Sequence, residues 1–229
     1  MSFVQISTFD GLNMKALEVL ADNKDAPGLI LIQEIFGVNA AMRQLAKDWA
    51  SRGFNVWCPD LFFRSEPGLE LDPKNKAQFD LGVELMQEMD NAKTLQDLES
   101  ARAQLAKKLG HENIVAVGYC MGGRLVLEMT AHSPIKAGVS YYGVNLDQVL
   151  PPMAQAAPAL LHIAEKDQWA QGEVLTVIEA EVAKRAGWES HVYAGCDHAF
   201  ARPKGDHFDA GADALAIQRT VDFIARHTN

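Results

Sequence analysis

Near its middle the chain reads Ile114-Val115-Ala116-Val117-Gly118-Tyr119-Cys120-Met121-Gly122-Gly123. The four apolar residues predict a buried strand, and the glycines on either side of Cys120 predict a tight turn into a helix, because only small residues fit beside such a turn. A strand, the pattern Gly-x-nucleophile-x-Gly and a helix are typical of a nucleophile elbow. Its apex carries Cys where Ser is usual. A thiol is already partly ionised near neutral pH, so this stretch predicts acyl transfer by a cysteine nucleophile.

Strand and helix patterns alternate over the rest of the sequence. Apolar runs predict further strands at residues 4–7, 14–20, 28–33, 54–58, 137–142, 159–164 and 191–193. Helical spacing of apolar residues predicts helices at 42–49, 73–90, 92–109, 122–132, 174–182 and 214–224. This alternation predicts a mostly parallel sheet of about eight strands with helices on both faces, in a single domain over residues 1–229. Together with the elbow, it leads us to expect an α/β-hydrolase fold. Leu61–Asp72, which contains Pro67-Gly68, predicts a long loop.

Composition narrows the class of protein. The 229 residues are 48% hydrophobic, and 21 Lys+Arg against 30 Asp+Glu leave a net charge of −9 without a basic stripe. These features argue against nucleic acid and membrane surfaces as partners, and the N-terminus does not resemble a signal peptide. The three cysteines show no metal-ligand spacing. We expect a cytoplasmic protein without metal or cofactor, a monomer or small homo-oligomer, that acts on a small molecule.

Three titratable residues follow predicted strands, where sites form in sheets of this kind. Asp167 follows the strand at 159–164, His198 follows the strand that ends near residue 194, and Glu34 follows the strand at 28–33. The chain order Cys120, Asp167, His198 is that of an α/β-hydrolase triad. The imidazole would take a proton from the thiol, and the Asp167 carboxylate would hold the imidazole in the required tautomer.

Other assignments stay open at this level. Asp147 is the alternative to Asp167, whereas the carboxylate of Asp197 adjoins His198 and points away from it in an extended loop. Glu34 is either a site residue or a solvated loop carboxylate. Cys58 and Cys196 are interpreted as inert buried thiols. For the oxyanion of the tetrahedral intermediate we predict two backbone donors, the N–H of Met121 and the N–H of Ile35.

The chain resembles the dienelactone hydrolases (carboxymethylenebutenolidases) over nearly its whole length. Six blocks carry the resemblance, in the same order and with similar spacing: Gln33-Glu34-Ile35-Phe36-Gly37-Val38-Asn39, Cys58-Pro59-Asp60-Leu61, Leu71-Asp72-Pro73, Gly118-Tyr119-Cys120-Met121-Gly122-Gly123, Tyr141-Tyr142-Gly143-Val144 and His198-Ala199-Phe200-Ala201-Arg202. The resemblance implies a triad of Cys120, His198 and Asp167. It also implies that Glu34 holds the resting thiol until substrate displaces it, and that an enol-lactone is opened through a thioester.

The resemblance also points to residues that contact substrate. Arg202 matches the family's Arg that pairs with the substrate carboxylate, and we expect Phe36, Tyr142 and Phe79 to line the same pocket. The chain departs from the family after Leu71-Asp72-Pro73. There the family has an Arg and a Tyr, and this chain has Phe79 and Val83. We therefore expect a lactone or a small ester, anionic or neutral, as substrate.

A second hypothesis belongs to a different class. The chain would be a non-catalytic member of the fold that binds a ligand or partner, with Cys120 as a redox-sensitive thiol. A binding protein does not need a nucleophile, a base, an acid and oxyanion loops together, so the sequence favours the hydrolase.

Overall fold

A computed structural model of the protein describes residues 1–23, 25–153 and 156–228. The chain divides by its internal contacts into two compact units, Met1–Ile114 and Val115–Asn229. Across the described residues there are eight strands and seven helices. No helix in this part of the chain combines the length and the apolar character needed to cross a membrane.

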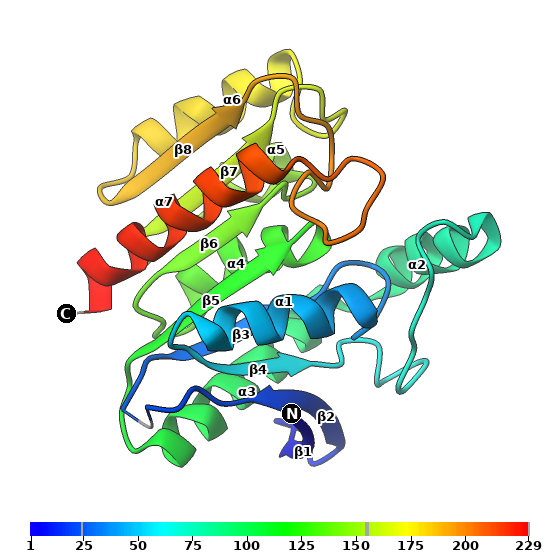
Figure 1. The fold of residues 1–229 in the computed structure, drawn as a ribbon, viewed down its shortest axis with the longest axis vertical. Coiled ribbons are helices and arrows are strands. Elements are labelled where there is room, and N and C mark those ends of the chain that lie inside the picture. The colour runs from blue at the N-terminus through cyan, green and yellow to red at the C-terminus, as the bar shows by residue number, and fades with distance from the viewer. Residues whose placement is uncertain (24, 154–155, 229) are drawn as a thin grey trace. The chain divides into compact units, whose positions relative to one another are not determined.

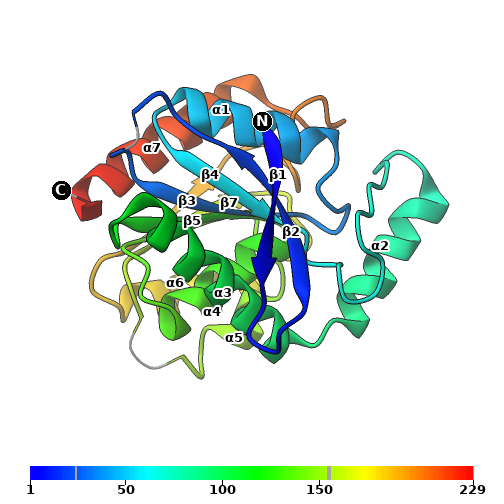
Figure 2. The same ribbon diagram turned by 90° about the horizontal axis from the view of Figure 1, so that it is seen from below.

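The first unit is built on four strands, β1 to β4, which Figure 1 labels. β1 (Ser2–Ser7) pairs antiparallel with β2 (Asn13–Val19), β2 pairs antiparallel with β4 (Asn55–Pro59), and β4 pairs parallel with β3 (Gly28–Ile32). α1 (Ala40–Ser51) and α3 (Asn91–Leu109) cover opposite faces of these strands, while α2 (Lys76–Glu88) projects beyond them (Figure 2). β3 and β4 are buried along their whole length, which explains their continuous apolar sequence.

The second unit holds four parallel strands in chain order. β5 (Ile114–Tyr119), β6 (Gly138–Tyr141), β7 (Ala159–Ala164) and β8 (Trp188–Tyr193) pair one after another. α4 (Met121–His132), α5 (Leu146–Val149) and α6 (Glu173–Ala183) lie on one face, and α7 (Ala210–Thr228) lies on the other (Figure 2). A cluster of buried apolar side chains joins the three helices to the strands, including Leu127 of α4, Leu146 of α5, Leu161 of β7 and Ile178 of α6.

The strands and helices confirm the predicted α/β class, with eight strands that are mostly parallel and helices on both faces of each unit. Two local predictions were incomplete. β8 begins at Trp188 rather than at residue 191, because Glu189 and Ser190 interrupt the apolar pattern even though they pair with β7. The four-residue helix α5 was missed, since one turn is too short to show periodicity. The prediction of a single domain stays a prediction.

The long loop predicted at 61–72 is held by side chains on both sides. Arg64 pairs with Asp10 of the β1–β2 turn (2.8 Å) and with Asp97 of α3 (2.8 Å). Farther along the loop, Asn39, which also caps α1, donates from Nδ2 to the Leu71 carbonyl (3.0 Å). The loop is therefore a fixed part of the first unit.

Candidate active site

Cys120 occupies a strained turn between β5 and α4. Its backbone angles are φ 56° and ψ −116°, which L-residues rarely adopt. The turn is held on both sides: the Cys120 N–H donates to the Tyr141 carbonyl of β6 (3.0 Å), and the Cys120 carbonyl accepts from the Gly123 N–H (2.9 Å). The residue is 7% exposed. The geometry is that of a nucleophile elbow, with the Cys at the apex.

Two glycines make this turn sterically possible. A Cβ on Gly118 would lie 2.1 Å from the Gly122 carbonyl oxygen, which is a fixed backbone atom. A Cβ on Gly123 would lie 2.7 Å from Ser140 Oγ and 2.9 Å from the Gly143 Cα. Strand β5 can therefore approach α4 this closely, and α4 can approach β6, only because these positions lack side chains.

The imidazole of His198 is bonded to the carboxylate of Asp167. His198 lies in the loop after β8, Asp167 lies in the loop after β7, and Nδ1 of the imidazole is 2.7 Å from Asp167 Oδ2. The other carboxylate oxygen, Oδ1, accepts from the Trp169 N–H (3.0 Å), and Asp167 is fully buried. A buried carboxylate with these partners makes Nδ1 the protonated nitrogen, which leaves Nε2 for the thiol.

The two loops are also joined by one side-chain and one backbone hydrogen bond. The Gly195 N–H donates to the Glu165 carboxylate (2.7 Å), and the Lys166 N–H donates to the Cys196 carbonyl (2.9 Å). These bonds keep the loop of Asp167 beside the loop of His198.

The two alternatives to Asp167 as the partner of the His198 imidazole take other positions in the structure. Asp147 lies in the first turn of α5. The Asp197 carboxylate accepts from the backbone N–H of His198 (2.7 Å) and so shapes the loop. The sequence analysis did not identify the Trp169 N–H as a donor to Asp167, because any residue type can supply a backbone N–H.

The environment of His198 favours its protonated form. Burial works to lower the pKa of the imidazole, but negative charge and a hydrogen bond at Cys120, together with Asp167, outweigh it and raise the pKa to about 10. The side chain nevertheless keeps 21% of its surface exposed. A charged imidazole beside a thiolate is the state that a cysteine nucleophile requires.

Aromatic rings pack around His198 in the second unit. The Tyr142 ring meets the imidazole edge-on at 5.1 Å, and Phe200 meets Tyr142 at 5.6 Å and stacks on Tyr193 at 4.8 Å. Phe200 is fully buried. Tyr142 was expected to contact substrate. In the structure its ring contacts the imidazole, and contact with substrate stays a prediction.

Met121 and Arg202 lie in the same unit as Cys120, Asp167 and His198. Met121 is the first residue of α4, so its N–H has no acceptor within the helix and is a suitable oxyanion donor. Arg202 lies in the loop between β8 and α7, four residues after His198, and is half-buried. Its N–H donates to the Ala199 carbonyl (3.0 Å), which closes a turn that starts next to His198.

The remaining predicted site residues belong to the first unit. Glu34, Ile35 and Phe36 follow β3 after one intervening residue and are at most 5% exposed, which argues against a solvated Glu34. Phe79 on α2 is 42% exposed, and its ring lies 5.8 Å from the ring of Phe36. The departure from the family pattern at Phe79 therefore forms an aromatic pair beside the loop that was predicted to donate to the oxyanion.

The other two cysteines, Cys58 and Cys196, are buried thiols. Burial raises the pKa of Cys58 and of Cys196, which keeps both in the unreactive thiol form. In the part of the chain that the structure describes, no three His, Cys, Asp or Glu side chains gather as a metal site would require.

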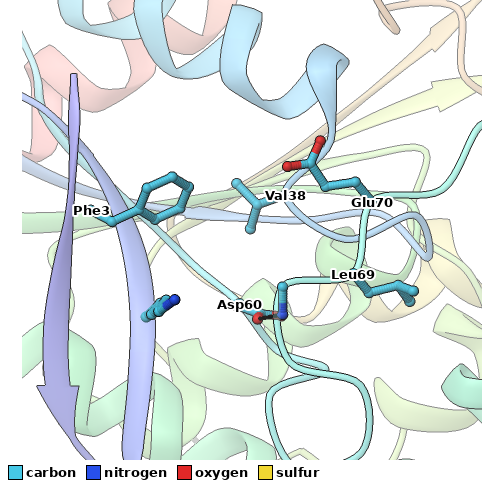
Figure 3. Close-up of a pocket in the computed structure, with 7 residues that line it drawn as sticks. Phe3, Val38, Asp60, Leu69 and Glu70 are labelled. Carbon is cyan, nitrogen blue, oxygen red and sulfur yellow. Dashed lines mark hydrogen bonds between the residues drawn. The ribbon is translucent and has the colours of Figure 1, made fainter.

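The first unit also contains a cavity of about 150 Å³ (Figure 3). It is lined by Phe3, Lys15, Val38, Asp60, Gly68, Leu69 and Glu70, none of which was predicted as a site residue. Asp60 Oδ2 accepts from the Gly68 N–H (2.7 Å), and burial raises the pKa of this carboxyl. The carboxylate thus fastens the loop that closes the cavity.

Comparison with known proteins identifies relatives that match nearly the whole chain. The family model for the dienelactone hydrolase family matches residues 14–228. A putative carboxymethylenebutenolidase of Azospirillum brasilense is 40% identical over 88% of each chain, and a carboxymethylenebutenolidase of Pseudomonas putida is 33% identical over 97% of this chain and 95% of its own. A solved structure described as a putative dienelactone hydrolase from Klebsiella pneumoniae has a TM-score of 0.84 at 26% identity, over 98% of each chain.

These matches cover the elbow, the loops of Asp167 and His198 and the segment after β3, and they confirm the α/β-hydrolase fold. They support a hydrolase that acts on the ester bond of a small lactone or ester, rather than a non-catalytic binding protein. The chain belongs to the dienelactone hydrolase family of ester-bond hydrolases.

Proposed function

We propose that the protein hydrolyses a lactone or small carboxylic ester through a thioester on Cys120. The observation that carries the proposal is the strained elbow, which presents a thiol to an imidazole that is itself bonded to a buried carboxylate. The family's dienelactone, which opens to maleylacetate, or a related lactone is the proposed substrate class. Because a thiolate must stay reduced to react, we also propose a cytoplasmic location.

Each step transfers a proton or breaks a bond at a named atom. The Cys120 sulfur, having given its proton to His198 Nε2, attacks the carbonyl carbon, and the carbonyl oxygen takes the electron pair. Collapse of this intermediate breaks the ester C–O bond, and His198 returns the proton to the leaving oxygen. In a lactone the leaving oxygen remains on the same molecule as the thioester.

Water completes the cycle. His198 takes a proton from water as the oxygen attacks the thioester carbon, and the carboxylic acid forms as the Cys120 thiolate leaves. The N–H groups of Met121 and Ile35 would stabilise the oxyanion in both steps. Glu34 would hold the thiol in its resting form before substrate binds, as the family pattern implies.

We propose that a cation and an aromatic pair contact different parts of the substrate. We propose that Arg202 pairs with a carboxylate on the substrate. The aromatic pair Phe36–Phe79 offers no such partner, so on that side we propose contact with an uncharged part of the substrate.

Intact-mass spectrometry with p-nitrophenyl acetate tests the thioester. We expect one acetyl group on the wild type that is absent in Cys120→Ala and unchanged in Cys196→Ala, a control that removes another buried thiol. Cys120→Ser should lower turnover by at least about a hundredfold, because a hydroxyl is far harder to ionise. An adduct that survives Cys120→Ala, or wild-type turnover in Cys120→Ser, would contradict the proposal.

A further inference from the structure

Helix α2 is attached to the first unit by one narrow face. Of its thirteen residues only Gly82 and Leu85 are buried. Phe79 lies three residues before Gly82 and so shares its face of the helix. The helix otherwise projects beyond the strands of its unit (Figure 1). A helix with so little buried surface contributes little to the core, so what that face touches is informative.

The narrow face rests on the loop after β3. A Cβ on Gly82 would lie 2.5 Å from the carbonyl oxygen of Ile35, a distance that only a backbone shift can relieve. One turn away, the ring of Phe79 packs on the ring of Phe36 at 5.8 Å. Helix α2 therefore contacts two consecutive residues of the loop, one through a missing side chain and the other through an aromatic pair.

The carbonyl groups on either side of Ile35 have hydrogen-bond partners. The Glu34 carbonyl accepts from Gln33 Nε2 (3.2 Å), and the Phe36 carbonyl accepts from the Leu71 N–H (3.0 Å). Between them, the Ile35 carbonyl lies against Gly82. The Ile35 carbonyl shares its peptide plane with the Phe36 N–H. Because the carbonyl groups on both sides are bonded, pushing the Ile35 oxygen aside must also shift the Ile35 Cα, and the N–H next to that Cα shifts with it.

We propose that α2 sets the position of the Ile35 N–H, and that Gly82 is the positioning residue because only glycine lets the helix meet the Ile35 carbonyl. The inference rests on the proposed function, in which this N–H donates to the oxyanion. It explains a glycine in the middle of a thirteen-residue helix, where intrinsic helix propensity would favour Ala.

Two variants on this helix, Gly82→Ala and Ala77→Gly, separate contact with the loop from helix propensity. Gly82→Ala raises helix propensity and places a methyl group against the Ile35 carbonyl, whereas Ala77→Gly lowers helix propensity at an exposed position. The proposal predicts that Gly82→Ala lowers kcat on p-nitrophenyl acetate by about tenfold to a hundredfold with little change in KM, since an oxyanion donor has moved. Ala77→Gly should keep kcat within about twofold of the wild type.

Alkylation of Cys120 by iodoacetamide separates positioning from general damage. In this reaction the sulfur displaces iodide and no oxyanion forms, so Gly82→Ala should react at the wild-type rate. If alkylation slows as much as hydrolysis, or if kcat in Gly82→Ala equals that of the wild type, the inference is wrong. If Gly82→Ala does not fold, Leu85→Ala, which removes the buried leucine side chain of α2, replaces it, and the same split between hydrolysis and alkylation is expected.

Failure of the proposed function gives a different result. In that case wild type and Cys120→Ala hydrolyse the ester at the same rate. Both the thioester mechanism and the inference about Gly82 are then wrong. Wild-type turnover that depends on Cys120 but is insensitive to Gly82→Ala would overturn the inference alone.

Discussion

Asp167→Asn should stop the reaction at the thioester. Asp167 Oδ1 accepts from the Trp169 N–H (3.0 Å), and Oδ2 accepts from His198 Nδ1 (2.7 Å). In the variant the amide oxygen must face Trp169, because turning the NH₂ group there leaves a buried N–H without an acceptor, which costs about 1–3 kcal/mol. The NH₂ group then faces Nδ1, which becomes an acceptor, and the proton moves to Nε2.

An imidazole protonated at Nε2 cannot take a proton from water. Loss of a general base lowers rates by about 10²–10⁴, or roughly 2.7–5.5 kcal/mol of activation free energy. Acylation should suffer less than hydrolysis of the thioester, since a thiol is partly ionised without help. We therefore expect a burst of p-nitrophenol in stopped-flow measurements, a steady-state rate lowered by about 10²–10⁴, and an acetyl adduct that accumulates on Cys120.

Asp197→Asn is the matched control. Asp197 adjoins His198 in sequence, and its carboxylate accepts from the His198 backbone N–H, a role that an amide oxygen can fill. Its rate should stay within severalfold of the wild type. The reasoning is refuted if Asp167→Asn turns over at the wild-type rate, or if it loses the burst while hydrolysis of the thioester is unaffected.

Three further predictions concern single residues. NMR titration should show His198 protonated up to about pH 10, and its pKa should fall in Cys120→Ala, because burial lowers it once the charge at Cys120 is gone; an unchanged pKa would contradict this cause. Arg202→Gln should raise KM for anionic esters by about tenfold and leave neutral esters unchanged; equal losses would make Arg202 structural. Gly118→Ala should lower the free energy of unfolding by about 1–3 kcal/mol in urea titrations, since its Cβ would lie 2.1 Å from the Gly122 carbonyl oxygen. Gly211→Ala, whose Cβ meets only Asp209 Oδ1 at 3.4 Å, should not lower it.

Local patterns were sufficient for much of the fold. The run Leu29–Ile32 predicted a buried strand because strands covered on both faces must be apolar throughout, and β3 is buried at every residue. The elbow was predictable because a turn this tight admits few residue types next to Cys120. Polar Glu189 and Ser190 hid the start of β8, since pairing with β7 and not the apolar pattern makes them part of a strand.

The candidate site, like the fold, was predictable in part from the sequence. Its residue types and their order along the chain are local information, and they were sufficient to nominate Cys120, Asp167 and His198. The choice of Asp167 over Asp147 depends on which loop lies beside that of His198, a contact between residues thirty-one positions apart. Nor does a sequence pattern show that Trp169 fixes the carboxylate or that Gly82 meets the Ile35 carbonyl, because these are contacts of backbone atoms. The sequence determines which reactive side chains are present. The backbone groups that orient them are brought into place only when the chain packs.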